Sequence, residues 1–136
     1  MGQIFEHEVV IVGAGPAGMC AAMYTGRAML DAVVLERGFP GGELLNTELV
    51  EDYPGFETIL GSELARKFQE HAVKFGAQFK TGVTVDAVRK RADGMFEVTT
   101  DAGDTYVSPT VIITAGGTPV KLGVPGELEY AGKGVS

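Results

Sequence analysis

Residues 9–18 read Val-Val-Ile-Val-Gly-Ala-Gly-Pro-Ala-Gly. An apolar run that ends in the spacing Gly-x-Gly-x-x-Gly predicts a buried parallel strand that turns sharply into a helix. In this pattern Gly13 allows the turn, Gly15 lets the backbone approach a pyrophosphate, and Gly18 lets the helix pack closely on the strand. Free backbone N–H groups and the positive end of the helix dipole would then face that pyrophosphate.

An acidic residue completes the pattern. Glu36 ends the next apolar run, residues 32–36, and follows Gly18 by 18 residues. In dinucleotide-binding folds a carboxylate about 20 residues further on accepts hydrogen bonds from an adenosine ribose. The front of the chain is therefore interpreted as a dinucleotide-binding βαβ unit. The alternative is a glycine-rich turn in another kind of α/β protein, with Glu36 as a solvated strand end.

The composition is typical of one globular domain that binds neither nucleic acid nor membranes. The chain has 136 residues, 45% of them hydrophobic, and its net charge of −7 repels nucleic acid and anionic lipid. Its basic cluster, residues 89–91, lies beside Asp93-Gly94 and is interpreted as a solvated hairpin end. The sequence contains neither a membrane span nor a signal peptide, so we expect the cytoplasm. The single cysteine, Cys20, is expected to be a small buried packing residue in the first helix.

Periodicity divides the rest of the chain into helices, strands and loops. Helical spacing covers residues 16–28 and 61–76, the second with Ser62 as a candidate cap and Gly76 as a candidate stop. Residues 37–60 and the C-terminal tail lack periodicity and are expected to be loops. Alternating or continuous apolar runs predict further strands at 77–81, 83–89, 95–100, 104–107 and 111–114. This order predicts an α/β fold, in which a parallel sheet carries helices and a three-stranded antiparallel meander inserted before its last strand.

Five motifs carry a resemblance to a known family. They are Gly13-Ala-Gly-Pro-Ala-Gly18, Glu36-Arg-Gly-Phe-Pro-Gly-Gly-Glu-Leu44, Val50-Glu-Asp-Tyr-Pro-Gly-Phe56, Ile112-Ile-Thr-Ala-Gly-Gly117 and Leu122-Gly-Val-Pro-Gly-Glu127. Together they resemble the N-terminal FAD-binding segment of the low-molecular-weight thioredoxin reductases over essentially the whole chain. The resemblance implies a Rossmann-like, three-layer α/β domain of the glutathione-reductase-like FAD/NAD(P)-binding type. It implies an incomplete FAD-binding domain at residues 1–123 and a hinge at 124–136 toward an NADPH domain outside this chain.

The resemblance also assigns residues to the adenosine and pyrophosphate of FAD. Residues 13–18 would hold the pyrophosphate, Glu36 the ribose, and Val85 the adenine through its main chain. Residues 114–116 would close over the pyrophosphate. The full set of FAD-binding residues that the resemblance implies is Gly13, Gly15, Pro16, Ala17, Gly18, Glu36, Arg37, Gly41, Gly42, Glu43, Leu44, Asn46, Asp52, Val85, Thr114, Ala115 and Gly116.

The flavin end departs from the family pattern in some details. The loop at 41–44 would follow the ribityl chain and flavin, with Asn46 and Asp52 near the isoalloxazine ring. Glu43 stands where the family usually has Gln, and Asp52 where Asn is common, so each position loses an amide donor. We expect the Glu43 carboxylate to point to solvent, because a charge at the flavin would disfavour its anionic reduced form. The pair at 114–115 inverts the usual Ala-Thr order.

The resemblance implies an FAD-dependent oxidoreductase similar to thioredoxin-disulfide reductase. In the full-length homodimer, electrons would pass from NADPH through FAD to a Cys pair and on to thioredoxin. The Cys pair and the NADPH site belong to parts of the family's sequence that this chain does not contain, so we expect the chain alone to lack activity and to expose apolar surface. No catalytic or metal-binding residue is predicted, and His7 and His71 are interpreted as structural.

Three other functions stay open at the level of sequence. A ferredoxin/flavodoxin–NADP reductase of the same architecture would lack the Cys pair. A non-catalytic FAD-binding module would hold FAD without reductase activity. If the chain were an NAD-dependent dehydrogenase domain, the glycine-rich loops at 41–44 and 54–55 would have no assigned function.

Overall fold

The computed structural model describes residues 2–118 and 120–134. Residues 1, 119 and 135–136 lie outside the described residues. They include the first residue of the predicted FAD-binding domain (1–123) and the last two residues of the predicted hinge (124–136). The strands and helices follow one another as β1 (Ile4–Glu6), β2 (Val9–Val12), α1 (Pro16–Arg27), β3 (Ala32–Glu36), the 3₁₀ helix η1 (Gly42–Asn46), β4 (Leu49–Val50), β5 (Ile59–Leu60), α2 (Gly61–Lys74), β6 (Gln78–Thr81), β7 (Val85–Lys90), β8 (Phe96–Thr100), β9 (Thr105–Ser108) and β10 (Thr110–Ile113).

The central layer is a parallel sheet with the strand order β10-β2-β3-β6. Val10 of β2 lies opposite Val33 of β3 on one side and Val111 of β10 on the other. Because both faces of such a sheet are covered, its inner strands are continuous apolar runs and not alternating ones. The predicted parallel sheet, with its last strand added after the meander, is confirmed.

The second sheet has the order β1-β9-β8-β7 and combines antiparallel and parallel pairing. Strands β7, β8 and β9 form the predicted antiparallel meander. Strand β1 adds a parallel partner to β9, pairing Phe5 with Tyr106. The sequence analysis did not predict β1, because three residues are too few for periodicity to be recognised.

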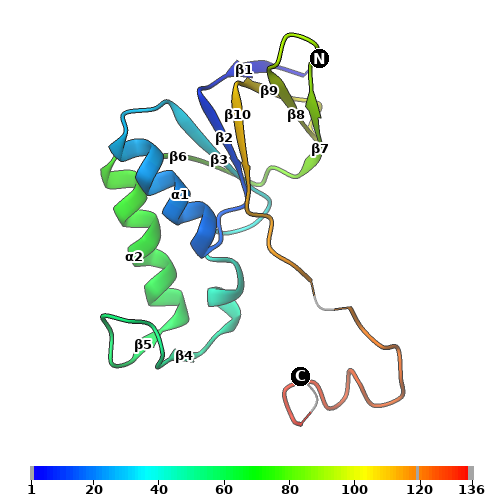
Figure 1. Ribbon diagram of the computed structural model, residues 1–136. Helices are drawn as coiled ribbons and strands as arrows, with labels where there is room; N and C mark the ends of the chain where they lie inside the picture. Colours follow the sequence, from blue (N-terminus) through cyan, green and yellow to red (C-terminus); the bar gives the residue numbers. More distant parts are fainter. Residues whose placement is uncertain (1, 119, 135–136) are drawn as a thin grey trace.

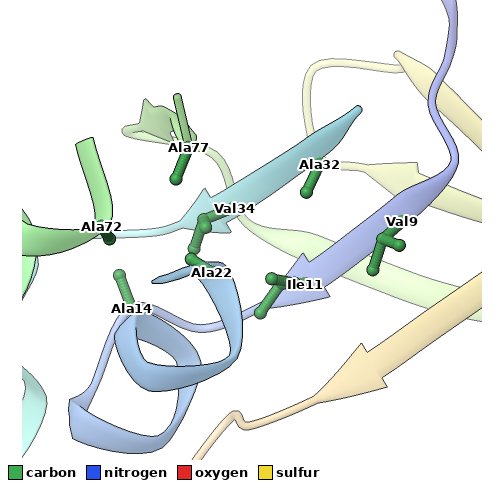
Figure 2. Packing of buried hydrophobic residues seen from close by; sticks show 8 residues of the cluster. All are labelled: Val9, Ile11, Ala14, Ala22, Ala32, Val34, Ala72 and Ala77. Atoms are coloured by element: carbon green, nitrogen blue, oxygen red, sulfur yellow. The ribbon is translucent and has the colours of Figure 1, made fainter. Parts of the chain in front are cut away.

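Alternate residues of the central strands face the two outer layers. Ile11 and Val34 pack with Ala22 of α1 and Ala72 of α2, and Figure 2 shows this cluster between the sheet and the helices. On the opposite face, Val10, Val33 and Leu35 pack against Val98 and Tyr106 of the meander. The helices cover one face of the parallel sheet and the antiparallel strands lie on the other (Figure 1). The predicted three-layer α/β architecture is confirmed.

The two helices pack closely because one of them carries a glycine at the contact. A Cβ atom on Gly26 of α1 would lie 2.5 Å from the Phe75 carbonyl oxygen at the end of α2. Helix α2 ends at Lys74, and the predicted stop, Gly76, lies two residues further on, with a φ of +91° and its N–H donated to Val73 O at 2.9 Å. The predicted Ser62 cap is wrong. The cap position is Leu60, because α2 begins at Gly61, the first residue of the predicted helical segment, and Ser62 lies inside the first turn.

The connection between β3 and α2 is less irregular than its sequence suggests. It contains η1 and a short antiparallel ladder in which Val50 pairs with Ile59. The Tyr53 ring lies 5.6 Å from the Phe68 ring of α2 in an edge-on arrangement, which attaches the hairpin to the helix. Past β10, the described tail consists of loop and turns, as predicted. Neither helix in the described chain is long and apolar enough to cross a membrane.

Replacing Gly18 with Ala should destabilise the fold by roughly 1–3 kcal/mol through overpacking. The new methyl would overlap the Gly13 carbonyl oxygen and lie 2.7 Å from Thr114 Oγ1. Ala is otherwise the better helix former by about 1 kcal/mol, so a net loss in urea unfolding isolates this contact. Gly117→Ala is the control, because its Cβ would meet no described atom within 4 Å. Equal stability of Gly18→Ala and the wild type would contradict the close packing.

Alkaline unfolding should depend on Tyr106. Burial, and then the charge of Asp104, raise the pKa of the Tyr106 hydroxyl above its ordinary value of 10.0. Below that value both folded and unfolded chains keep the proton, whereas above it the unfolded chain ionises first, so the free energy of unfolding falls as pH rises. Tyr106→Phe should flatten this fall, measured by urea unfolding at a series of pH values. Tyr24→Phe, at an exposed side chain, should leave the slope as it is.

Candidate nucleotide-binding cleft

A cleft of about 380 Å³ opens at the carboxyl ends of β2, β3 and β10. Ligands bind at this edge in open α/β sheets, because the loops that follow the strands converge there. The residues that line the cleft are Val12, Gly13, Gly15, Pro16, Ala17, Leu35, Glu36, Arg37, Gly42, Glu43, Val83, Thr84, Val85, Thr114, Ala115, Gly116 and Gly117.

The glycine-rich loop joins β2 to α1 along the cleft. Gly13 adopts a φ of +97° and donates its N–H to the Leu35 carbonyl at 2.8 Å, so the chain turns as soon as β2 ends. Gly15 is the N-cap of α1 and Pro16 its first residue. The first turn of α1 carries no acidic side chain, so its positive dipole end is not neutralised within the helix. This end of α1 suits an anion in the cleft.

Glu36 brings the second charged feature to the cleft. Its carboxylate accepts a hydrogen bond from the Ala14 N–H at 2.7 Å and another from the Gly38 N–H at 2.8 Å, one on each oxygen. Each carboxylate oxygen has a further lone pair. Glu36 therefore fixes the glycine-rich loop to the end of β3 and can still accept hydrogen bonds from hydroxyl groups in the cleft.

A second pair of glycines, Gly41 and Gly42, packs against the glycine-rich loop between β2 and α1. Gly41 donates its N–H to the Ala14 carbonyl at 2.8 Å. A Cβ on Gly42, which has a φ of +55°, would lie 3.0 Å from the Gly15 Cα, so the two glycine-rich segments touch. Glu43 next to this contact is exposed, and its carboxylate accepts a hydrogen bond from the Asn46 side-chain amide at 3.3 Å. The expected solvent exposure of Glu43 is found, although the residue also lines the cleft.

The cleft gathers most of the predicted residues, but not all of them. Those that line it are Gly13, Gly15, Pro16, Ala17, Glu36, Arg37, Gly42, Glu43, Val85, Thr114, Ala115 and Gly116. Gly18 and Gly41 lie behind it and act through packing and the Ala14 bond. Leu44, Asn46 and Asp52 are not among its lining residues, so their assignment to the flavin stays a prediction.

The sequence analysis missed five lining residues, Val12, Leu35, Val83, Thr84 and Gly117. Val12 and Leu35 end the two central strands, and in the sequence they look like ordinary core positions. The available signal was their place immediately before Gly13 and Glu36, at the carboxyl ends of parallel strands.

A second, more apolar groove of about 400 Å³ lies along the other side of α1. Cys20 lines it together with Tyr53, Phe68 and His71. The expectation that Cys20 is buried is wrong, because its side chain is exposed on the face of α1 that does not meet the sheet. His7, by contrast, has a structural place. Its Nδ1 lies 3.0 Å from an Asp31 carboxylate oxygen, at the junction of β1 with the parallel sheet.

Comparison with known proteins agrees with this geometry. The thioredoxin reductase of Bacillus subtilis is 50% identical over 131 residues, and the alignment covers 96% of this chain and 40% of that protein. The thioredoxin reductase of Listeria monocytogenes is 46% identical with the same coverage. The chain thus spans about 40% of the length of the curated relatives it matches.

Solved structures show the same fold. The thioredoxin reductase of Lactococcus lactis superposes with a TM-score of 0.83 at 40% identity and covers 93% of this chain and 41% of its own. That of T. acidophilum gives a TM-score of 0.83 at 45% identity, with 95% and 41% covered. Residues 7–136 match the family model described as pyridine nucleotide-disulphide oxidoreductase. The glycine-rich cleft, the three-layer fold and this match agree, and the chain belongs to the pyridine nucleotide-disulphide oxidoreductase family.

Proposed function

We propose that the chain binds FAD in this cleft, as the flavin-binding portion of a thioredoxin-reductase-like enzyme. The observation that carries the proposal is the meeting of two complementary features in one cleft. The positive first turn of α1 can face the two phosphates. The Glu36 carboxylate, at the end of the neighbouring strand β3, can accept hydrogen bonds from the hydroxyl groups of the adjoining ribose. The Gly13–Ala14–Gly15 backbone links the two features, so their spacing is built into the loop.

The remaining lining residues suit the two ends of FAD. Val85, the first residue of β7, and Thr84 before it would lie near an adenine ring beyond Glu36. Ala115 and Gly116 would cover the pyrophosphate from the β10 side. We assign the ribityl chain and flavin to the Gly42–Glu43 end of the cleft, with Leu44, Asn46 and Asp52 beyond it. This assignment rests on the family resemblance.

Bound FAD would supply the electron transfer itself, and the residues of this chain would bind and orient it. In the whole protein we propose that electrons reach FAD from NADPH and leave through a Cys pair to thioredoxin. The identity to named thioredoxin reductases supports this route. We also propose a homodimer, as the resemblance implies, and a cytoplasmic location, as expected from the sequence. Analytical ultracentrifugation and cell fractionation test these two points.

The alternative of a ferredoxin/flavodoxin–NADP reductase is not favoured by the relatives, which are named thioredoxin reductases. The electron donor still has a specific second candidate. One similar structure, 28% identical, is titled a ferredoxin-flavin thioredoxin reductase. Reduction of the flavin in the protein that carries this chain, with NADPH in one cuvette and reduced ferredoxin in another, separates the two donors.

Replacing Glu36 with Gln should weaken FAD binding about 10- to 100-fold, because a charged acceptor for the ribose is lost. Gln also turns an NH₂ group toward one of the two backbone N–H groups that the carboxylate accepts. Flavin fluorescence titration measures the Kd, at a temperature where circular dichroism shows the variant folded. Glu63→Gln, at an exposed position on α2, is the matched control. Unchanged affinity in Glu36→Gln would remove this residue from the site.

The choice between FAD and NAD can be tested directly. The chain should bind FAD, and ADP should displace this FAD, because ADP contains the same adenosine and pyrophosphate groups. NAD contains the same two groups, so it should compete like ADP and no better, because the flavin end of the cleft gains nothing from nicotinamide. Equilibrium dialysis with an absorption spectrum of the retained flavin measures both. Tighter binding of NAD than of FAD would favour the dehydrogenase alternative.

A further inference from the structure

One hydroxyl group connects the last parallel strand to the glycine-rich loop. Thr114 follows β10, and its backbone N–H donates to the Val12 carbonyl at 2.8 Å, extending the sheet by one bond. Its side-chain hydroxyl lies 2.9 Å from the same carbonyl oxygen and 3.0 Å from the Gly13 carbonyl oxygen. A hydroxyl has a single proton to donate, so the two carbonyls share it. Thr114 therefore bonds both to the end of β2 and to the first residue of the loop.

The same hydroxyl lies where α1 comes closest to the sheet. A Cβ on Gly18 would lie 2.7 Å from Thr114 Oγ1 and would overlap the Gly13 carbonyl oxygen. A Cβ on Gly13 would lie 2.5 Å from the Thr114 carbonyl oxygen. Thr114, Gly13 and Gly18 thus meet at one point behind the cleft, with no room for an additional carbon atom.

We propose that Thr114 is a positioning residue for the nucleotide site. Its hydroxyl sets the orientation of the Gly13 peptide, and through it the direction of the Ala14 and Gly15 backbone that faces the cleft. The Gly13 carbonyl lies against Gly18 in the first turn of α1, and the Thr114 hydroxyl is the partner that the structure gives it among the described residues. A partly buried carbonyl that loses its donor would rotate toward solvent, and the loop would rotate with it.

This role concerns an unusual feature of the chain. The family pattern named above has Ala before Thr at this point, whereas this chain has Thr114 before Ala115. Ala115 faces the cleft, where the inverted order leaves a methyl group. In this chain the hydroxyl at position 114 bonds to the Val12 and Gly13 carbonyls and so supports the loop. The consequence for the ligand rests on the proposed function, because it concerns a pyrophosphate held by the loop.

Amide hydrogen exchange of the ligand-free chain tests the positioning without any nucleotide. Thr114→Ala should accelerate exchange of the Gly13 and Ala14 amides about 5- to 10-fold, the effect of one lost hydrogen bond. The Ile11 amide, inside β2, should change only with global stability. Thr114→Ser keeps the hydroxyl and should restore slow exchange in the loop. Thr110→Ala, exposed on the same strand, is the control. Equal exchange in Thr114→Ala and the wild type would overturn the proposal.

ADP serves as the probe for the effect on binding, because it carries the adenosine and pyrophosphate without the flavin. Thr114→Ala should raise its Kd about 5- to 10-fold at equal fractions of folded protein. Thr114→Ser and Thr110→Ala should stay within about twofold of the wild type. An unchanged Kd beside accelerated loop exchange would overturn the positioning of the ligand and leave a purely structural bond. If the wild type bound neither ADP nor FAD, the proposed function would fail, and the exchange result would still decide the role of Thr114 in the loop.

Discussion

The approach of α1 to the end of β2 is the constraint on which the cleft depends. A helix that starts three residues after a strand must pass over the last peptide of that strand, and here the Gly13 carbonyl occupies the space where a Cβ of Gly18 would lie. Because this contact sets how far the first turn of α1 stands from the sheet, it also sets where the dipole end meets the cleft. A larger residue at position 18 would therefore move the site as well as strain the core.

Besides the Gly13 N–H bond to Leu35, three long-range hydrogen bonds hold the loop that this contact creates. The Ala14 N–H donates to Glu36, the Ala14 carbonyl accepts from Gly41, and the Gly13 carbonyl accepts from Thr114. These partners come from three different segments: Glu36 ends β3, Gly41 lies in the connection that follows β3, and Thr114 follows β10. Removing any one of these hydrogen bonds leaves a peptide group of the loop without its partner. The three segments are therefore coupled through the backbone atoms of Gly13 and Ala14. The cleft is preorganised in the sense that hydrogen bonds already hold the peptides of this loop before a ligand enters.

The sequence allowed the fold to be predicted where local signals and burial agree. The apolar runs of β2 and β3, covered on both faces, and the alternation of the meander strands leave little freedom of assignment. Strand β1 was missed because its three residues form a strand only beside β9. Cys20 is predicted to be buried because it is small and its sequence neighbours are apolar, although it lies on an exposed face of α1 at the second groove. In both places the neighbour that decides the outcome is distant in sequence.

In the cleft, too, some residues could be predicted from the local sequence, and others depend on neighbours that are distant in sequence. The glycines at 13, 15, 41 and 42 could be recognised from the sequence, because their tight turns and close contacts favour glycine over other residues. Gly13, for example, has a φ of +97°. Val12 and Leu35 could not be recognised by residue type, because an apolar side chain that lines a cleft and one in a core satisfy the same physical requirement. The Thr114 hydroxyl lies between these cases. Its residue type departs from the family pattern, but only the distances to the Val12 and Gly13 carbonyls show that its hydroxyl bonds to the loop. A departure from a motif therefore locates a residue of interest, and the geometry decides on which side of the loop it acts.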